Sequence, residues 1–129
     1  MQQATLHIEG PVADVLLDPL ALPSWNEAFL SIDGPATPSG HRYQLRVRPG
    51  LTGWLEYTAI SPTRIDITWQ VPGFHEDGVW QIDQGRVTHS FEHTGPLAAV
   101  LRPAYRGIAT VRLQRLSVEV GARLAVSAQ

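Results

Sequence analysis

Cysteine and lysine are both missing from this chain of 129 residues, whose ten basic side chains are all arginine. Without Cys the protein has no thiol nucleophile, no disulfide and no thiolate ligand for zinc or an iron–sulfur cluster. Without Lys, Schiff-base catalysis is excluded. No apolar run approaches the roughly 18 residues that span a bilayer, and no charged segment followed by an apolar one opens the chain. We therefore expect a cytoplasmic protein that does not insert into membranes.

Charged residues are also few, at 17 % of the chain, and the formal net charge is −2. An overall basic field that would attract nucleic acid is therefore missing. Arg42, Arg46 and Arg48 share one face of a predicted strand, which we interpret as a solvated stripe, and we predict no nucleic-acid partner. The length fits a single domain over residues 1–129, with a core that needs no disulfide or metal. Monomer and homodimer both stay open.

The hydrophobic pattern changes its period along the chain, between the period of two that is typical of strands and the period of a helix. A short strand is expected at 5–9, and the region 11–29 is typical of two short helices, because Pro11, Pro19 and Pro23 interrupt a helical pattern. From Phe29 the apolar residues alternate with period two, which predicts antiparallel strands joined by short turns. These strands are expected at 29–32, 41–48, 54–60, 64–71, 79–83 and 86–93, with a loop over 72–78. A helical period then predicts one long amphipathic helix over 104–124.

This order predicts an α+β fold with a six- or seven-stranded antiparallel sheet and a long C-terminal helix. One helix can cover only part of the apolar face of such a sheet. The sheet must therefore curl around the helix, and the short helices and the sheet would then enclose a cavity.

Four short motifs in this order resemble a known superfamily. They are VLLDPLALPSWN over Val15–Asn26, ISPTRI over Ile60–Ile65, GRVTH over Gly85–His89 and GPL over Gly95–Leu97. Together they are similar to the START-like helix-grip (SRPBCC) superfamily, in particular its bacterial polyketide cyclase/dehydrase and lipid-transport-like branch. The resemblance implies the helix-grip fold and a deep hydrophobic cavity between the sheet and the C-terminal helix. It implies no single reaction and no universal catalytic residues.

The cavity should be lined by inward-facing strand positions and by one face of the last helix. The parity of 54–60 is ambiguous, because Leu55, Tyr57 and Ala59 form the more apolar face while Trp54 lies on the other. The predicted ligand-binding residues are Tyr43, Leu45, Tyr57, Ile67, Trp69, Trp80, His89, Phe91, Tyr105, Ile108 and Arg112. Trp25 and Asn26 are interpreted as structural.

His89, Glu56 and Tyr57 are the candidate catalytic residues. His89 and His93 share strand parity but lie roughly 13 Å apart along an extended chain, too far to bind one metal. With Phe91 between them, His89 is expected to point into an apolar cavity, either as an acid–base group or as a plain core histidine.

Two further charged groups have open interpretations. His75-Glu76-Asp77 falls in the predicted loop, as a solvated turn or as an acid–base group at the cavity mouth. Arg102, Arg106 and Arg112 could hold a carboxylate or enolate, or be solvated or salt-bridged. No nucleophile elbow, phosphate-binding loop or metal-ligand box is present, so we predict no metal and no cofactor.

Three functions compete. The first is binding of a hydrophobic or amphipathic small molecule, such as a lipid, an aromatic compound or a polyketide-like metabolite. The second is a polyketide cyclase or aromatase that uses cavity His, Tyr and Arg side chains. The third is a regulatory or partner-binding domain. A smooth apolar cavity favours the first, convergent ionisable groups favour the second, and a collapsed cavity with an exposed apolar patch favours the third.

Overall fold

The structure is a computed structural model and describes residues 1–38 and 40–127. Seven strands form one sheet. They are β1 (Gln2–His7), β2 (Phe29–Asp33), β3 (Tyr43–Val47), β4 (Leu51–Ile60), β5 (Arg64–Val71), β6 (Phe74–Asp83) and β7 (Arg86–Thr94). The helical elements are α1 (Val12–Leu16), η1 (Pro19–Ala21), α2 (Leu22–Trp25), α3 (Ala98–Leu101), η2 (Arg102–Tyr105) and α4 (Ile108–Ser127).

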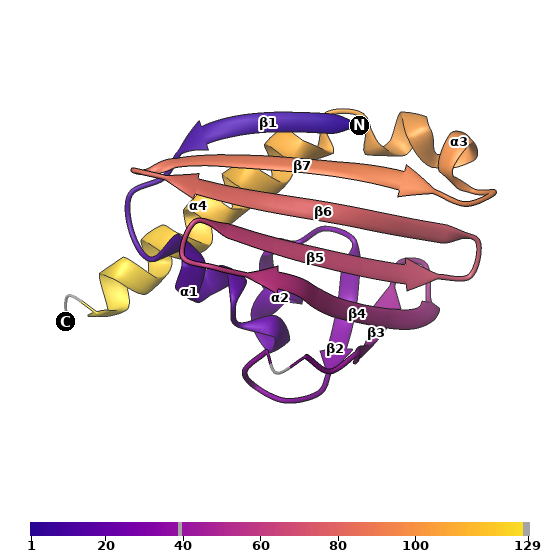
Figure 1. Cartoon of the computed structure of the whole chain (residues 1–129), viewed down its shortest axis with the longest axis horizontal. Coiled ribbons are helices and arrows are strands. Elements are labelled where there is room, and N and C mark those ends of the chain that lie inside the picture. The colour runs from indigo at the N-terminus through magenta and orange to yellow at the C-terminus, as the bar shows by residue number, and fades with distance from the viewer. Residues whose placement is uncertain (39, 128–129) are drawn as a thin grey trace.

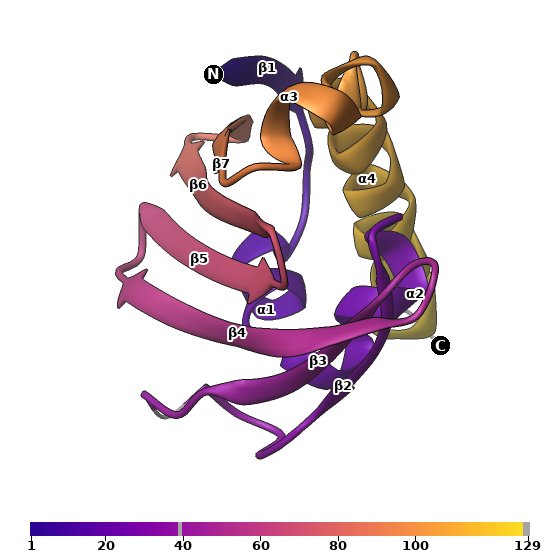
Figure 2. The same cartoon turned by 90° about the vertical axis from the view of Figure 1, so that its right-hand side faces the viewer.

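The sheet is antiparallel throughout, in the order β1-β7-β6-β5-β4-β3-β2. Strands β2 to β7 are neighbours in chain order, and β1 closes the edge beside β7 (Figure 1). The sheet curves around the short helices, with α4 on its concave side (Figure 2). This is the predicted α+β helix-grip fold, with seven strands.

Alternation of apolar and polar side chains explains the strands, because one face is buried. In β3 the buried and exposed residues alternate without exception, and in β5 every inward residue is buried. In β4 Leu55 and Tyr57 face inward, which settles the parity that the sequence left open. Gly53 lies where β4 passes very close to β5, since a Cβ there would be 1.7 Å from the carbonyl oxygen of Gln70.

Several predicted boundaries are shifted: the first strand covers Gln2–His7 and not 5–9, and β4 begins at Leu51 and not at residue 54. Two further differences affect the site. The loop over 72–78 does not exist, because Pro72-Gly73 is a complete turn with Gly73 at φ +81° and β6 begins at Phe74. The long helix begins at Ile108 and not at residue 104. Gly107 has φ +76° and Arg106 is extended, so residues 98–105 form α3 and η2 instead.

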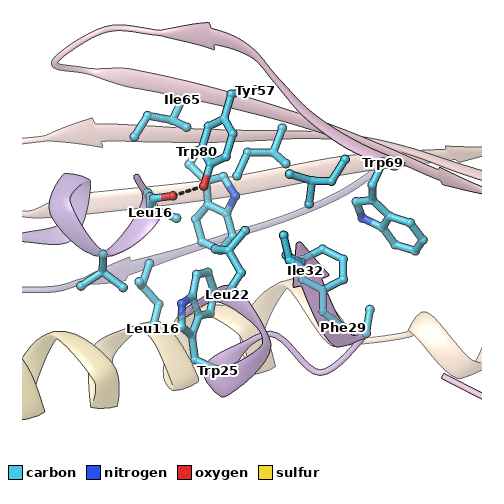
Figure 3. Close-up of a cluster of buried hydrophobic side chains, with 14 of the residues drawn as sticks. Leu16, Leu22, Trp25, Phe29, Ile32, Tyr57, Ile65, Trp69, Trp80 and Leu116 are labelled. Atoms are coloured by element: carbon cyan, nitrogen blue, oxygen red, sulfur yellow. Dashed lines mark hydrogen bonds between the residues drawn. The ribbon is translucent and has the colours of Figure 1, made fainter. Parts of the chain in front are cut away.

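The hydrophobic core fills the space between the sheet and the helices (Figure 3). Trp25 meets the edge of Trp80 at 5.6 Å between ring centroids, which agrees with a structural role for Trp25. The Tyr57 hydroxyl donates to the carbonyl of Leu16 and ties β4 to α1. Burial raises the pKa of Tyr57, helped by the nearby Tyr43 and Asp18, so this phenol stays protonated.

Candidate functional site

A buried arginine lies at the centre of the site. Arg112 belongs to the inward face of α4, one helical turn after Ala109 and one before Leu116, and its exposed fraction is 0 %. Core positions of this kind are normally apolar, and a fully buried cation must be paired. Every nitrogen of the Arg112 guanidinium accordingly has an acceptor within 3.2 Å.

Glu76 on β6 is the main partner of Arg112. Its two carboxylate oxygens accept from Arg112 Nη1 and Nη2 at 3.0 and 2.9 Å, in a bidentate pair. The same oxygens accept from Trp69 Nε1 at 2.9 Å and from His93 Nε2 at 2.8 Å. Burial acts to raise the pKa of Glu76, but the charge and hydrogen bonds of Arg112 and His93 outweigh it and lower this pKa to about 2. Glu76 is therefore an anion.

A second carboxylate, Glu27, completes the pairing of Arg112. Its oxygens accept from Arg112 Nε at 3.1 and 3.2 Å. Glu27 lies two residues after the end of α2, where the Asn26 side chain accepts from the backbone of Ala28 at 3.1 Å and fixes the turn. The Trp25-Asn26 motif thus has a positioning consequence, because the packed Trp25 and the capped turn aim Glu27 at α4.

His89 on β7 is a buried, neutral member of the cluster. Its Nδ1 donates to the carbonyl of Val79 at 3.1 Å, and its Nε2 accepts from Arg112 Nη1 at 3.2 Å. The ring stacks on Trp80 at 3.7 Å between centroids. Burial and the charge of Arg112 lower the pKa of His89 to about 3, against the opposing charge of Glu76. Both ring nitrogens are occupied, and no proton can be added cheaply.

His93 and Tyr105 lie at the edge of the cluster. The His93 ring is surrounded by Phe74, Phe91 and Tyr105, with centroids 4.4, 4.8 and 4.5 Å away. Among the described residues, the one fully buried side-chain nitrogen or oxygen without a hydrogen-bond partner is Trp25 Nε1. His93 Nδ1 and the Tyr105 hydroxyl also have no partner there, so solvent must reach both atoms.

Two pockets meet at Tyr105. One has a volume of about 280 Å³ and the other about 240 Å³. The first is lined by Met1, Gln2, Phe91, Glu92, His93, Ala98, Arg102 and Tyr105, and the second by Glu27, Ala28, Arg48, Leu101, Ala104, Tyr105 and Ile108. Both are lined in part by residues of α3 and η2, and α3 lies beside β7 at this end of the sheet (Figure 2). The cluster therefore reaches one pocket through His93 and the other through Glu27.

Arg112, Glu27, Glu76 and His89 together carry one negative charge in excess. Arg112 carries one positive charge, Glu27 and Glu76 carry two negative charges, and His89 is neutral. Burial and the charge of Glu76 raise the pKa of Tyr105 to about 12, with Arg112 opposing. Tyr105 therefore keeps its proton at neutral pH and presents a hydroxyl that can donate a hydrogen bond.

The residues predicted as ligand contacts fall into three places. Phe91, Tyr105 and Ile108 line the two pockets, and His89 and Arg112 belong to the buried cluster. The others are buried side chains of the hydrophobic core: Tyr43, Leu45, Tyr57, Ile67, Trp69 and Trp80.

Glu56, a candidate catalytic residue, lies outside the cluster. Its carboxylate is on the outer face of β4, 3.9 Å from Arg42. His75 and Asp77 are also on the outer face, where they pair at 3.0 Å. Only Glu76 of the His75-Glu76-Asp77 motif points inward, so it is neither a solvated turn residue nor part of a loop.

The sequence pattern does not reveal two members of the cluster. It predicts a loop at Glu76, although Phe74, Glu76, Gly78 and Trp80 continue one inward-facing register. Glu27 carries no signal except its place after the Trp25-Asn26 motif.

The described part of the chain holds no candidate metal site and no helix that could span a membrane. Over residues 1–38 and 40–127, no group of three His, Asp or Glu side chains is arranged to hold a metal ion. In the same part of the chain, none of the helices combines the length and apolarity needed to cross a membrane.

Comparison with known proteins shows the fold alone. No family model and no curated protein matches the chain. A protein of Chromobacterium violaceum is similar in structure, with a TM-score of 0.66 and 18 % identity over 92 % of this chain and 96 % of its own. A hypothetical protein of Helicobacter pylori gives 0.65 and 11 % over 92 % and 85 %. A putative protein from the dynemicin biosynthetic locus gives 0.56 and 18 %, over 92 % of this chain and 47 % of that one.

Proposed function

We propose that this protein binds a compact amphipathic molecule under the α3–η2 segment, beside the Arg112–Glu76 cluster. The observation that carries the proposal is the pair of open polar atoms, His93 Nδ1 and the Tyr105 hydroxyl, within aromatic surroundings. The larger of the two pockets combines the rings of Phe91 and Tyr105 with polar side chains, among them Gln2, Glu92, His93 and Arg102. Polar groups that converge beside apolar surface fix the orientation of a ligand in small-molecule sites. The apolar body of the ligand would lie against Phe91 and Tyr105, and its polar end would meet His93.

The volumes of the two pockets limit the size of the ligand. Each pocket is slightly below the range of roughly 300–1,000 Å³ that is common for ligand sites, at about 280 and 240 Å³. An aromatic or short-chain molecule suits this space better than a lipid with two long chains. Tyr105 separates the two pockets, and no residue of α3 or η2 is buried. Leu101 and Tyr105 pack partly against the core, and displacement of the segment would join the two pockets for a longer ligand.

Two neighbouring alanines allow a matched test. Ala98 lines the larger pocket, whereas Ala99 is exposed on the same short helix and lines neither pocket. Ala98→Trp should fill the pocket and weaken binding of the fluorescent probe 8-anilinonaphthalene-1-sulfonate at least tenfold, while Ala99→Trp should leave it unchanged. Ala104→Trp tests the smaller pocket in the same way. Equal probe binding by wild type, Ala98→Trp and Ala104→Trp would remove the basis for a site here.

Several broader proposals rest on the fold. We propose that the chain is a START-like (SRPBCC) protein, a single domain that works in the cytoplasm as a monomer or homodimer. The structural neighbours support the fold on which this rests, and the one from the dynemicin locus fits its polyketide-related branch. A cyclase-like enzyme is the second candidate function, because six ionisable side chains converge at one end of the sheet: Glu27, Glu76, His89, His93, Tyr105 and Arg112.

A further inference from the structure

We propose that His93 is a general base, oriented by Glu76, that removes a proton from an activated C–H bond of a molecule in the larger pocket. The inference rests on the proposed binding site and adds an activity to it. His93 is the catalytic residue of the proposal, because it alone would touch the reacting atoms. Glu76 is a positioning residue that acts through the imidazole.

The hydrogen bonds fix which nitrogen is available. Glu76 is an anion that accepts from His93 Nε2 at 2.8 Å, so this nitrogen carries a proton. In the neutral ring Nδ1 is then the nitrogen with a free lone pair, and among the described residues it has no hydrogen-bond partner and is not fully buried. A carboxylate that holds one imidazole nitrogen while the other faces the substrate is the arrangement of a general base.

Comparison with His89 shows why His93 is the histidine that can act as a base. His89 lies beside the same Arg112–Glu76 cluster, but both of its ring nitrogens are hydrogen-bonded, one to the carbonyl of Val79 and one to Arg112. In His93 one nitrogen is bonded and one is open. The carboxylate of Glu76 cannot rotate away from the ring, because Arg112 holds it in a bidentate pair and Trp69 donates to it as well. The base is therefore held in place by contacts that do not involve the ligand.

Charged and titratable groups around His93 come from four elements. Glu76 of β6 and, behind it, Arg112 of α4 face the ring from inside. Tyr105 and Arg102 of η2 and Glu92 of β7 line the pocket with it. The excess negative charge of the cluster balances the imidazolium that forms when Nδ1 takes a proton. The Tyr105 hydroxyl and the Arg102 guanidinium are placed to stabilise negative charge that develops on an oxygen of the molecule.

The probe 5-nitrobenzisoxazole converts the proposal into a measurable step. His93 Nδ1 takes the proton from carbon 3, and the electrons of that C–H bond complete the C≡N triple bond. The N–O bond breaks, and its electron pair leaves on the phenolate oxygen of 2-cyano-4-nitrophenolate. The proton passes from His93 to water, so no oxidant, reductant or second substrate is needed. Absorbance of the phenolate reports the rate.

His93→Gln is the informative variant, because its amide nitrogen can still donate to Glu76 while the basic nitrogen is gone. We expect kcat/KM to fall by about a hundredfold or more. His75→Gln is the matched control. His75 also pairs with a carboxylate, Asp77, but lies on the outer face with both nitrogens engaged, and its rate should equal that of the wild type. Circular dichroism and thermal melting verify that both variants are folded.

The outcomes separate this inference from the proposed function. Displacement of 8-anilinonaphthalene-1-sulfonate by 5-nitrobenzisoxazole without turnover would overturn the base and leave the binding site intact. Turnover that survives in folded His93→Gln would also overturn it. Absence of binding by either compound would overturn both proposals. Saturable turnover that is lost in His93→Gln and kept in His75→Gln would support the base.

Discussion

Acid should destabilise the wild-type chain between pH 7.5 and 4.5, and a His89→Gln variant should lose this dependence. In the folded state the pKa of His89 is lowered to about 3 from 6.5, because the ring is buried and Arg112 donates to it. In the unfolded chain the imidazole takes up a proton near its ordinary pKa. Below pH 6.5 the unfolded state therefore binds more protons than the folded state, and the free energy of unfolding falls as the pH falls.

The size of the effect follows from the shift. Each pH unit below 6.5 removes about 1.4 kcal/mol. The loss should be about 1 kcal/mol at pH 5.5 and about 3 kcal/mol at pH 4.5. Glu76 contributes in a separate window, because its pKa is lowered from 4.5 to about 2 and its stabilisation disappears only as the pH falls through that range. The interval from 6.5 to 4.5 therefore reports mainly on His89.

Urea unfolding followed by tryptophan fluorescence at four pH values would measure the slope. The side-chain amide of Gln can replace both hydrogen bonds of His89, a donor toward Val79 and an acceptor for Arg112, but it does not titrate. His41→Gln, at an exposed position, is the control and should keep the wild-type slope. A wild-type stability that stays constant down to pH 4.5, or a His89→Gln variant with the wild-type slope, would refute the assignment of a neutral, buried imidazole.

Two other changes test the packing. Arg112→Met leaves Glu27 and Glu76 without their cation and should cost about 3–5 kcal/mol of unfolding free energy at neutral pH. The control Arg115→Met, at an exposed position, should cost less than about 0.5 kcal/mol. Equal losses in urea unfolding would contradict the buried ion pair. Gly53→Ala should lower stability by more than about 2 kcal/mol, because the added Cβ would lie 1.7 Å from a carbonyl oxygen of β5. Gly121→Ala, in open space on α4, should instead raise thermal stability by up to about 1 kcal/mol.

Most of the fold could be predicted because half-buried strands show their period directly. The alternation of Tyr43, Leu45 and Val47 is visible without any knowledge of what covers them. The same rule failed at 74–78, because Glu76 and Gly78 follow Phe74 on the inward face and interrupt its apolar pattern. Glu76 occupies an inward position there, and only its partner on α4 makes that position tenable. A strand with a charge in its core face is indistinguishable from a loop when the partner is distant in sequence.

The predicted start of the long helix is wrong for a different reason. Residues 98–124 are compatible with helix along most of their length, and glycine is tolerated inside a helix at a cost of about 1 kcal/mol. Gly107 adopts a positive φ, which separates η2 from α4 and sets Tyr105 over the end of the sheet. The tertiary position of Tyr105, between Phe74 and Phe91, decides this conformation, and the local sequence does not record it.

Hydrogen-bond satisfaction separates the structural members of the cluster from those available for chemistry. Arg112, Glu76 and His89 have all their strong polar atoms engaged, as buried groups must. His93 Nδ1 and the Tyr105 hydroxyl are left open at the pockets, although both side chains are mostly enclosed by aromatic rings. Sequence parity could identify the inward-facing histidines but not this difference, because it depends on which atoms the buried arginine uses. Arg112 donates to Nε2 of His89, which leaves that histidine without a free nitrogen. The same guanidinium holds Glu76 against Nε2 of His93 and thereby orients the second histidine.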